Sequence, residues 1–355
     1  MSLTSRSFLP FALSLLLFSC GNSGKENGSK TDTGTYSPTV DSTGRVVSVA
    51  DGQVDEPVLL QYRFTPGKAF RFYMRHAEEM EQKRDTIGQG GKTLVEYWFT
   101  FTPKSGQVLE GEITRVKYSG KFVTTQTGAQ ELSYDSENAA DSSRKGMLAQ
   151  FTAALHHPFF IKVSSVGSID SIWGLEGIEN ELLGTDAART KLETKMKIRD
   201  DYARNVLKGT LQLIFQKLHD KPVTVDSSWS ITQDAMLGYL QVQHHAIYRL
   251  AGRVDDGGTR MEKITMTMKS KYAGPKIIET GQGNAEVREY HVTGGGTAFF
   301  DMDKHRAVSR SLHQNLNLKV FVEIPQELKE ATNNQFSDFY MTQTAKISTE
   351  VKEIQ

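Results

Sequence analysis

Apolar and polar residues alternate along much of the chain beyond residue 57, a pattern typical of half-buried β-strands. The alternation covers residues 60–64 and resumes over residues 70–74, after Thr65-Pro66-Gly67-Lys68. Proline presets φ and glycine permits positive φ, so this tetrapeptide predicts a turn. We therefore expect the two strands to form a hairpin.

Similar alternation recurs toward the C-terminus, divided by short polar or glycine-rich stretches. Residues 92–101 carry apolar side chains on both faces, which predicts a central strand covered on two sides. We interpret Gly281-Gln282-Gly283 and Gly294-Gly295-Gly296 as turns or bulges between strands. The other expected strands cover residues 108–118, 160–163, 168–172, 240–250, 264–268, 276–280, 285–292, 297–302, 306–312, 317–323 and 339–347.

A long helix is predicted over residues 186–219, where apolar residues recur at three- and four-residue steps. Its first half is mostly charged and its second half mostly apolar. We expect the second half to pack on the sheet and the first half to be exposed, with Gly209 as a kink or close-packing point. Shorter helices are expected over residues 147–155 and 174–183.

Together these elements predict an α+β fold that is mainly β. We expect one or two long, curved antiparallel sheets with helices packed on the concave face. Residues 58–355 are predicted to form a single body. Alternatively, this body divides into β-rich halves at 58–183 and 222–350, joined by the long helix 186–219. No clear residue-level repeat decides whether the halves arose by duplication.

Residues 1–19 have the pattern of a signal peptide. Arg6 precedes an apolar run from Phe8 to Phe18 that is too short to span a membrane as a helix. The run ends in Leu17-Phe18-Ser19-Cys20, which resembles a bacterial lipobox, although Phe18 is bulkier than the usual residue there. The resemblance implies cleavage before Cys20 and attachment of fatty-acyl chains such as palmitate at its thiol. An ordinary signal peptide that happens to contain a cysteine is the alternative.

Residues 20–57 are predicted to be the acylated cysteine and a flexible tether, because glycine, serine and threonine predominate over residues 21–45. The whole chain has 42 basic and 42 acidic residues, which gives no electrostatic reason to expect nucleic acid as a partner. Cys20 is the only cysteine, so its acylation leaves no thiol for a disulfide or a zinc site. No other apolar stretch of the sequence is long enough to span a bilayer as a helix.

Several stretches, taken in order, carry a family resemblance. They are Leu60-Gln61-Tyr62-Arg63-Phe64 with Pro66-Gly67-Lys68, then Tyr97-Trp98-Phe99, Tyr134-Asp135-Ser136, the stretch from Val163 to Leu175, and Val223-Thr224-Val225-Asp226-Ser227-Ser228-Trp229. Over roughly residues 58–325 the chain resembles a family of uncharacterised bacterial lipoproteins of the Bacteroidota type, a domain of unknown function. Asp226 departs from that pattern, which has a glycine at this position.

The resemblance implies a lipid-anchored envelope protein and brings no known activity and no catalytic residues. A curved sheet with helices in its concavity also resembles, more loosely, the lipoprotein-carrier half-barrels, which hold acyl chains. That second likeness concerns the fold alone and is weak evidence for function.

Candidate catalytic and metal-binding residues are few. His156-His157 precede Pro158 at a predicted helix end, where capping is the expected role. His244-His245 lie on one predicted strand and point to opposite faces, so they cannot chelate one metal. Asp301-Met302-Asp303-Lys304-His305 lacks the glycine and distal glutamate of a calcium loop and predicts a hairpin turn. We therefore expect no catalytic residues, no metal, no cofactor and no enzymatic activity.

The most suggestive apolar set is Tyr239, Tyr248, Met261, Met266, Met268 and Phe299, because methionine adapts to irregular ligands. Packing of these residues against the long helix is the plainer interpretation. The first hypothesis is a non-catalytic lipoprotein of the cell envelope, anchored at the outer membrane through Cys20, that binds or carries an apolar ligand. The alternatives are a structural or assembly lipoprotein that binds another envelope protein, and an unrecognised hydrolase.

Overall fold

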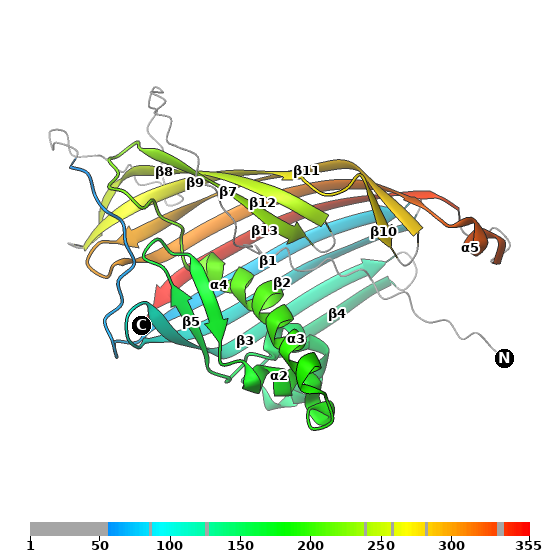
Figure 1. The fold of residues 1–355 in the computed structure, drawn as a ribbon, viewed down its shortest axis with the longest axis horizontal. Coiled ribbons are helices and arrows are strands. Elements are labelled where there is room, and N and C mark those ends of the chain that lie inside the picture. Colours follow the sequence, from blue (N-terminus) through cyan, green and yellow to red (C-terminus); the bar gives the residue numbers. More distant parts are fainter. Residues whose placement is uncertain are drawn as a thin grey trace.

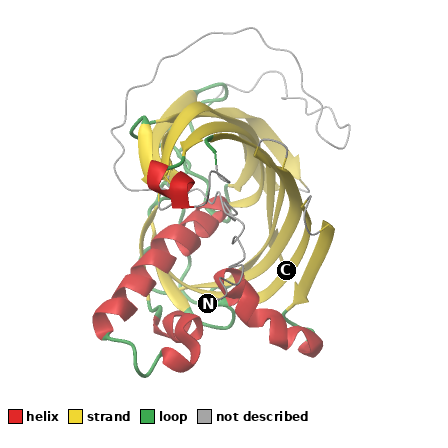
Figure 2. Cartoon of the chain, turned by 90° about the vertical axis from the view of Figure 1, so that its right-hand side faces the viewer, coloured by secondary structure: helices red, strands yellow, loops and turns green. Residues whose placement is uncertain are grey.

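The protein is built on one long, curved antiparallel sheet (Figure 1). The computed structural model describes residues 56–84, 87–124, 128–237, 240–256, 259–280, 283–331 and 337–355. Within them, 13 strands form one sheet in the order β6-β5-β3-β2-β1-β13-β12-β11-β9-β8-β7, with β4 beside β3 and β10 beside β11. Figure 2 shows the sheet curving round and a helix lying on its concave side. The predicted fold class, mainly β with helices on a concave face, is confirmed.

Along the chain, a first group of strands is followed by a largely helical region and then by a second group of strands. The first strands are β1 (Phe70–Arg84), β2 (Ile87–Pro103), β3 (Val108–Thr124), β4 (Gly128–Asp135), β5 (Phe159–Val163) and β6 (Ile169–Trp173). The helical elements are η1 (Ala139–Leu148), α1 (Ala149–Thr152), α2 (Glu176–Leu183), η2 (Gly184–Asp186), α3 (Leu192–Tyr202), η3 (Ala203–Leu207), α4 (Lys208–Ile214) and α5 (Gln326–Ala331). The later strands are β7 (Ser228–Leu237), β8 (Leu240–Asp256), β9 (Thr259–Tyr272), β10 (Ile277–Thr280), β11 (Gly283–Asp301), β12 (Arg306–Glu323) and β13 (Phe339–Ile354).

The two β-rich halves of the sequence join in one sheet through β1 and β13. These strands pair in register from Arg71 with Ile354 to Arg84 with Met341. Figure 1 shows them side by side near the middle of the sheet. Strands from both ends of the described chain therefore belong to the same curved sheet.

The predicted long helix divides by burial as expected. It runs as α3, a π-helical segment η3 and α4, so it begins later and ends earlier than predicted. Most residues of α3 are exposed, whereas every residue of α4 from Gly209 to Ile214 is buried. The irregular segment is η3, which ends two residues before Gly209. An extra residue per turn re-aims the helix where it passes from solvent onto the sheet.

The predicted hairpin between residues 60–64 and 70–74 is wrong. Leu60 and Tyr62 are buried, but their segment is not a strand beside β1. Its backbone bonds to other partners: the Tyr62 amide donates to the Ser165 carbonyl oxygen at 2.8 Å. The turn itself is present, with Gly67 at φ 76°. The alternation of apolar and polar residues therefore predicted which side chains of this segment are buried. It did not predict the partners of the backbone hydrogen bonds.

The glycine run at residues 294–296 is not a turn. It lies inside β11, which continues through it and pairs with β12 on one side and β9 on the other. A Cβ on Gly294 or Gly296 would lie 2.6 Å or 2.3 Å from a carbonyl oxygen of β12. Glycine is thus required for close backbone approach in a curved sheet, and the strands predicted on either side merge into one.

The strand around residues 92–101 is also less enclosed than predicted. Tyr97, Phe99 and Phe101 are buried on one face, whereas Trp98 on the other face is half-buried. Arg115 lies over the Trp98 ring, with its guanidinium carbon 4.9 Å from the ring centroid. The outer face is covered by a long cationic side chain and not by a second layer of structure.

Aromatic packing fixes the end of α4 against the sheet. Phe215 follows α4. Its ring centroid lies 5.8 Å from the centroid of Tyr62 and 5.5 Å from that of Phe101. Arg310 on β12 is buried and donates from Nη1 to the carbonyl oxygens of Gln212 and Leu213 at 2.9 and 3.0 Å. A cation there satisfies carbonyls left free at the helix C-terminus and opposes the helix dipole.

Candidate functional site

Side chains that share a register row define the concave face, because directly paired residues of neighbouring strands lie on the same face of a sheet. We call one such row the first row. It comprises Trp229, Tyr248, Met266, Gly296, Leu312, Thr349, His76, Val95, Tyr118 and Tyr134. The second row lies two residues further along β1 and comprises Ile231, Ala246, Met268, Gly294, Gln314, Ile347, Glu78, Thr93, Gly120 and Leu132.

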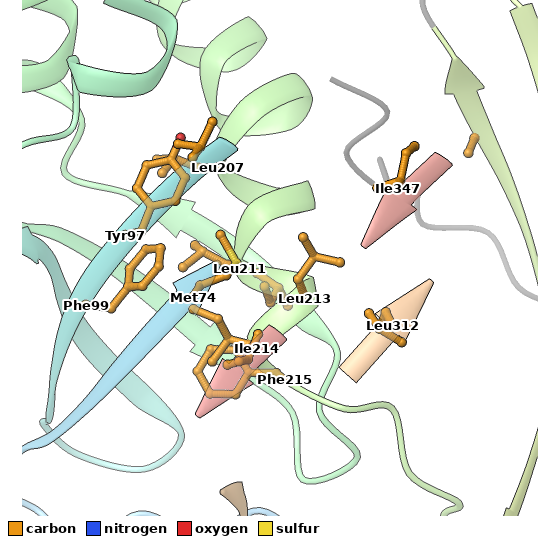
Figure 3. Close-up of a cluster of buried hydrophobic side chains, with 14 of the residues drawn as sticks. Met74, Tyr97, Phe99, Leu207, Leu211, Leu213, Ile214, Phe215, Leu312 and Ile347 are labelled. Atoms are coloured by element: carbon orange, nitrogen blue, oxygen red, sulfur yellow. The ribbon is translucent and has the colours of Figure 1, made fainter. Parts of the chain in front are cut away.

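Helix α4 lies against this face. In Figure 3 its residue Leu213 lies beside Leu312 of the first row and Ile347 of the second row. Leu207 lies beside Tyr97 on β2, so the helix extends across several strands of the sheet. A void of about 10 Å³ remains between Leu213 and the rows, which is room for about one water molecule. The face is therefore tightly filled where α4 covers it.

Polar side chains appear on β1, β2 and β13 at and beyond the first row. His76 Nδ1 lies 2.8 Å from Thr349 Oγ1. Further along, Gln82 donates to Met341 Sδ at 2.6 Å, and Gln343 donates to Met80 Sδ at 3.0 Å. Amides facing soft sulfur atoms satisfy their donors only weakly, because thioether sulfur is a poor acceptor. This part of the face combines apolar and hydrogen-bonding groups.

Burial shifts the pKa of the titratable groups on these rows. Desolvation lowers the pKa of His76 to about 4, so the ring is neutral at physiological pH. Desolvation raises the pKa of Glu78 to about 7. The pKa of Tyr118 is raised, first by burial and then by the nearby Glu78 carboxyl. These three side chains are therefore largely uncharged in mildly acidic solution.

The structure divides the predicted apolar set. Tyr248, Met266 and Met268 are buried on the concave face, on adjoining strands of the first and second rows. Met261 and Phe299 are half-buried on the opposite face, because their positions alternate with the interior residues Glu262 and Phe300. Tyr239 lies outside the described residues, as does Cys20.

Glu262 explains why Met261 turns outward. Glu262 is 0% exposed and its Oε1 accepts from Arg253 Nε at 3.2 Å and from Arg260 Nη2 at 2.9 Å. The strand parity that places Ile264, Met266 and Met268 inside also places Glu262 inside, where the two guanidinium groups offset its burial.

Sequence reasoning missed Glu78, although a signal was present. Phe70, Phe72 and Met74 were predicted to share a face, and continuing the period of two along the same strand reaches His76 and Glu78. The polar run that follows concealed the continuation, because it looks like the end of a strand.

The pair His244-His245 and the acidic turn lie as predicted. His244 points to the interior and burial lowers its pKa to about 4, while His245 on the opposite face lies 3.0 Å from Thr232 Oγ1. Asp301 Oδ1 accepts from the backbone amides of Asp303 and Lys304, both at 2.9 Å, in the turn between β11 and β12. Across the described ranges, no cluster of histidine, cysteine and acidic side chains could hold a metal ion.

The end of the first helix differs slightly from the prediction. α1 ends at Thr152, so His156 and His157 lie in the turn beyond it and not at its last residue. His156 has φ 59° and its Nδ1 lies 3.4 Å from Glu112, while His157 Nε2 lies 3.7 Å from Glu181. Their observed contacts are therefore with carboxylates.

A groove of about 750 Å³ runs across β4, β3, β2, β1, β13 and β12, and three consecutive residues of each strand line it, among them Glu78 and the other second-row residues of these strands. Small side chains line it, including Ala77, Ser119 and Ser348. The ion pair Lys92–Glu79, at 2.8 Å, lies at its rim. Both charge signs occur along the groove, so electrostatics alone select no ligand class for it.

The match to known families spans the helical region and much of the second half of the sheet. The chain matches a model described as a family of unknown function (DUF6263) over residues 113–305, more than half of its length. The chain belongs to this family. The predicted resemblance to a family without known activity is thereby confirmed, whereas bacterial origin and lipid anchoring stay predictions. The family match includes the long helix, Tyr248, Met266 and Met268, but ends before β12 and β13.

Comparison with solved structures gives only distant likenesses. The chain is similar to lipovitellin, from a study of its lipid–protein interactions, with TM-score 0.44 and 10% identity over 82% of this chain and 26% of that one. It thus spans about a quarter of the lipovitellin chain. It is also similar to an outer membrane channel from Pseudomonas putida F1, with TM-score 0.23 and 5% identity over 87% of this chain and 100% of the channel. Similarities at this level carry no argument about the protein's function.

No protein of curated function matches the chain significantly. Among the helices of the described residues, none is both long enough and apolar enough to cross a membrane.

Proposed function

We propose that the protein is a non-catalytic, lipid-anchored protein of the cell envelope that binds an apolar ligand on the concave face of its sheet. The apolar lining of β8, β9, β11 and β12 supports this most directly. It includes the buried residues Val242, Met268, Val292, Leu316 and Leu318. Among the described residues, α4 contacts β12 through Arg310 and Leu312, and no helix packs extensively on β8, β9 or β11, so the lining of these three strands extends past the part of the face that α4 covers. An apolar ligand would lie along this lining.

Methionines make the lining adaptable. Met266 and Met268 lie on the first and second rows, and Met80 and Met341 lie further along the same face. Their unbranched thioethers fit irregular apolar shapes at little cost in strain, which suits a flexible hydrocarbon chain. The polar groups on β1 and β13 then give such a chain a place for its hydrophilic end.

Native mass spectrometry with lipid extraction tests ligand binding. Protein that begins at Arg45 retains every described residue and lacks the predicted anchor. Copurified lipid at a one-to-one ratio is the expected result and would identify the ligand class. Protein that is recovered bare, and that also fails to enhance the fluorescence of an apolar naphthalene probe, would contradict ligand binding.

Lipid anchoring is tested by the variant Cys20→Ser. The predicted lipobox residues Leu17 to Cys20 support this part of the proposal. Two or three acyl chains, at roughly 0.8 kcal/mol per buried methylene, anchor a protein stably, whereas the serine variant has no thiol to acylate. We expect the variant to leave the membrane fraction. A variant that partitions fully with membranes would refute acylation at Cys20 as the anchor.

The open edge of the sheet favours a second candidate function, assembly with another envelope protein. The path of paired strands ends at β7, so one backbone edge of Ser228–Leu237 has no strand partner among the described residues. Such an edge can accept a strand from a partner. Cross-linking in the envelope tests this: a specific adduct that Thr232→Lys abolishes would favour assembly, and an adduct unaffected by that charge would argue against the edge.

A further inference from the structure

Glu78 is distinctive on the second row because one oxygen of its buried carboxyl group has no hydrogen-bond partner among the described residues. The residue is 7% exposed, and no described residue hydrogen-bonds to its Oε1. Its strand neighbours in the row are Thr93 on β2 and Ile347 on β13. Carboxylates are rarely buried unless they are paired, and an orphaned acceptor costs free energy. An unmatched oxygen at the edge of the region covered by α4 therefore points to a bound group that completes it.

The polar groups around Glu78 are uncharged near neutral pH. Gln314 shares its row, and His76, one step back on the same face, is neutral and contacts Thr349. Gln82, two steps forward, accepts a hydrogen bond from Gln89. The adjacent charges of Glu79 and Lys92 lie on the opposite face, where they pair with each other. The interior thus offers hydrogen bonds without a counter-charge.

We propose that Glu78 holds the polar end of the ligand, donating a hydrogen bond from its protonated carboxyl group to the carbonyl oxygen of an uncharged acyl ester. This inference rests on the proposed function and names its ligand class. An ester carbonyl satisfies the carboxyl group without adding charge, and its acyl chain fits the apolar lining of β9, β11 and β12. A cationic headgroup would instead create a buried ion pair among uncharged side chains, which is costly to desolvate.

The protonation state of Glu78 makes this binding pH-dependent. Its pKa of about 7 means that the donor is present in mildly acidic solution and is lost above neutrality. Tyr118 and Tyr134, which face the same space from β3 and β4, have raised pKa values, because both are buried, and stay neutral. The pKa of His76 is about 4, so it also keeps one state between pH 5.5 and 8.5.

The other charged groups described in the interior hold other partners, and Glu262 on β9 is paired with Arg253 and Arg260. Arg84, at the far end of β1, lies over the Phe339 ring at 3.7 Å. Arg310, in the opposite direction, caps α4. Neither guanidinium titrates in the same range. A change in binding between pH 5.5 and 8.5 would therefore report on Glu78.

The experiment measures binding of mono-oleoylglycerol, which is uncharged at every pH used, to the purified full-length chain. If only the protonated protein binds, affinity falls by about 30-fold from pH 5.5 to pH 8.5 for a group with pKa near 7. Glu78→Gln retains a hydrogen-bond donor that does not titrate, so its affinity should be the same at both pH values. Glu78→Leu should bind about tenfold more weakly than wild type at pH 5.5, because one hydrogen bond is lost.

Glu79→Gln is the matched control, since it removes a neighbouring carboxylate on the opposite face, and it should behave as wild type. Equal, pH-independent binding by wild type, Glu78→Gln and Glu78→Leu would overturn the role of Glu78 while leaving apolar ligand binding intact. Absence of binding by every variant at both pH values would overturn the acyl-ester inference. If the native protein also carries no lipid in mass spectrometry, the proposed function fails with it.

Discussion

The two ends of the concave face are built on the same strands but are filled differently. Toward the start of β1, aromatic rings and α4 occupy the interior, and Phe215 contacts Tyr62, Phe64 and Phe101. Toward the end of β1, the interior positions carry amides, methionines and Glu78. One curved sheet thus combines a sealed aromatic core with a more polar lining along the same strands.

The hydrogen bonds follow the same division. At the helical end, Arg310 and Gln212 satisfy the free carbonyls around the end of α4: Gln212 donates to Gly167 and Phe215 oxygens at 2.9 and 2.8 Å. At the other end, one oxygen of Glu78 has no hydrogen-bond partner within the part of the chain that the structure describes. Stability gained in the core allows groups that cost stability to persist elsewhere, which is the usual relation between a scaffold and a binding site.

The largest expected effect comes from truncating the centre of the aromatic core. Phe215→Ala should lower the free energy of unfolding by about 4 kcal/mol, because the ring is 1% exposed and its removal leaves a cavity. Urea unfolding followed by circular dichroism measures the change. Phe122→Ala, at the other end and 37% exposed, should cost about 1 kcal/mol or less. Equal losses would mean that the two ends contribute alike to stability.

An intermediate effect is expected from the cap of α4. Arg310→Met should cost about 2 kcal/mol, because two helix carbonyls lose their donor inside the core. The control is Arg249→Met, which removes an exposed guanidinium paired with Asp226 at 2.7 Å and should cost less than about 1 kcal/mol. Hydrogen exchange of the α4 amides should increase in the first variant only. Unchanged exchange would show that Arg310 does not hold the helix.

The smallest expected effect has the opposite sign. Burial raises the pKa of Glu78 to about 7 in the folded protein, so its contribution to stability is fully present below its ordinary pKa and is lost as pH rises through 7. Glu78→Gln should therefore raise the free energy of unfolding at pH 8 by about 1–2 kcal/mol and leave it unchanged near pH 4. Denaturant titrations at both pH values measure the difference, with Glu79→Gln as the control. A destabilised variant at pH 8 would mean that the carboxylate is stabilised by a partner in the fold.

The spacing of apolar residues along the sequence predicted which side chains of a single strand or helix are buried. The face shared by Phe70, Phe72 and Met74 and the buried second half of the long helix follow from periods of two and 3.6. The pairing of distant segments does not follow from such patterns. The segment around Tyr62 alternates as a strand does, yet its amide bonds to Ser165, a partner far along the chain.

The candidate site was only partly predictable for the same reason. In Ala298-Phe299-Phe300, either ring could face inward on local grounds, and pairing with Lys263 and Glu262 decides that Phe300 does. Gly294 and Gly296 resemble a turn because the neighbours that require glycine belong to β12. Glu78 became a candidate ligand-binding residue only when the strands were aligned in register. Its neighbours in the row belong to β2 and β13, which are distant from it in the sequence or lie on other strands.

The pairing of β1 with β13 also constrains the order in which the molecule can fold. Most strand pairs join neighbours in sequence and can form as soon as both strands have been synthesised, whereas the central pair joins Arg71 to Ile354, nearly the full length of the described chain. The sheet therefore cannot become continuous until translation has reached the last strand. A chain that ended before Phe339 would expose β1 and β12 as long unpaired edges, the kind of surface that draws copies of a protein into aggregates.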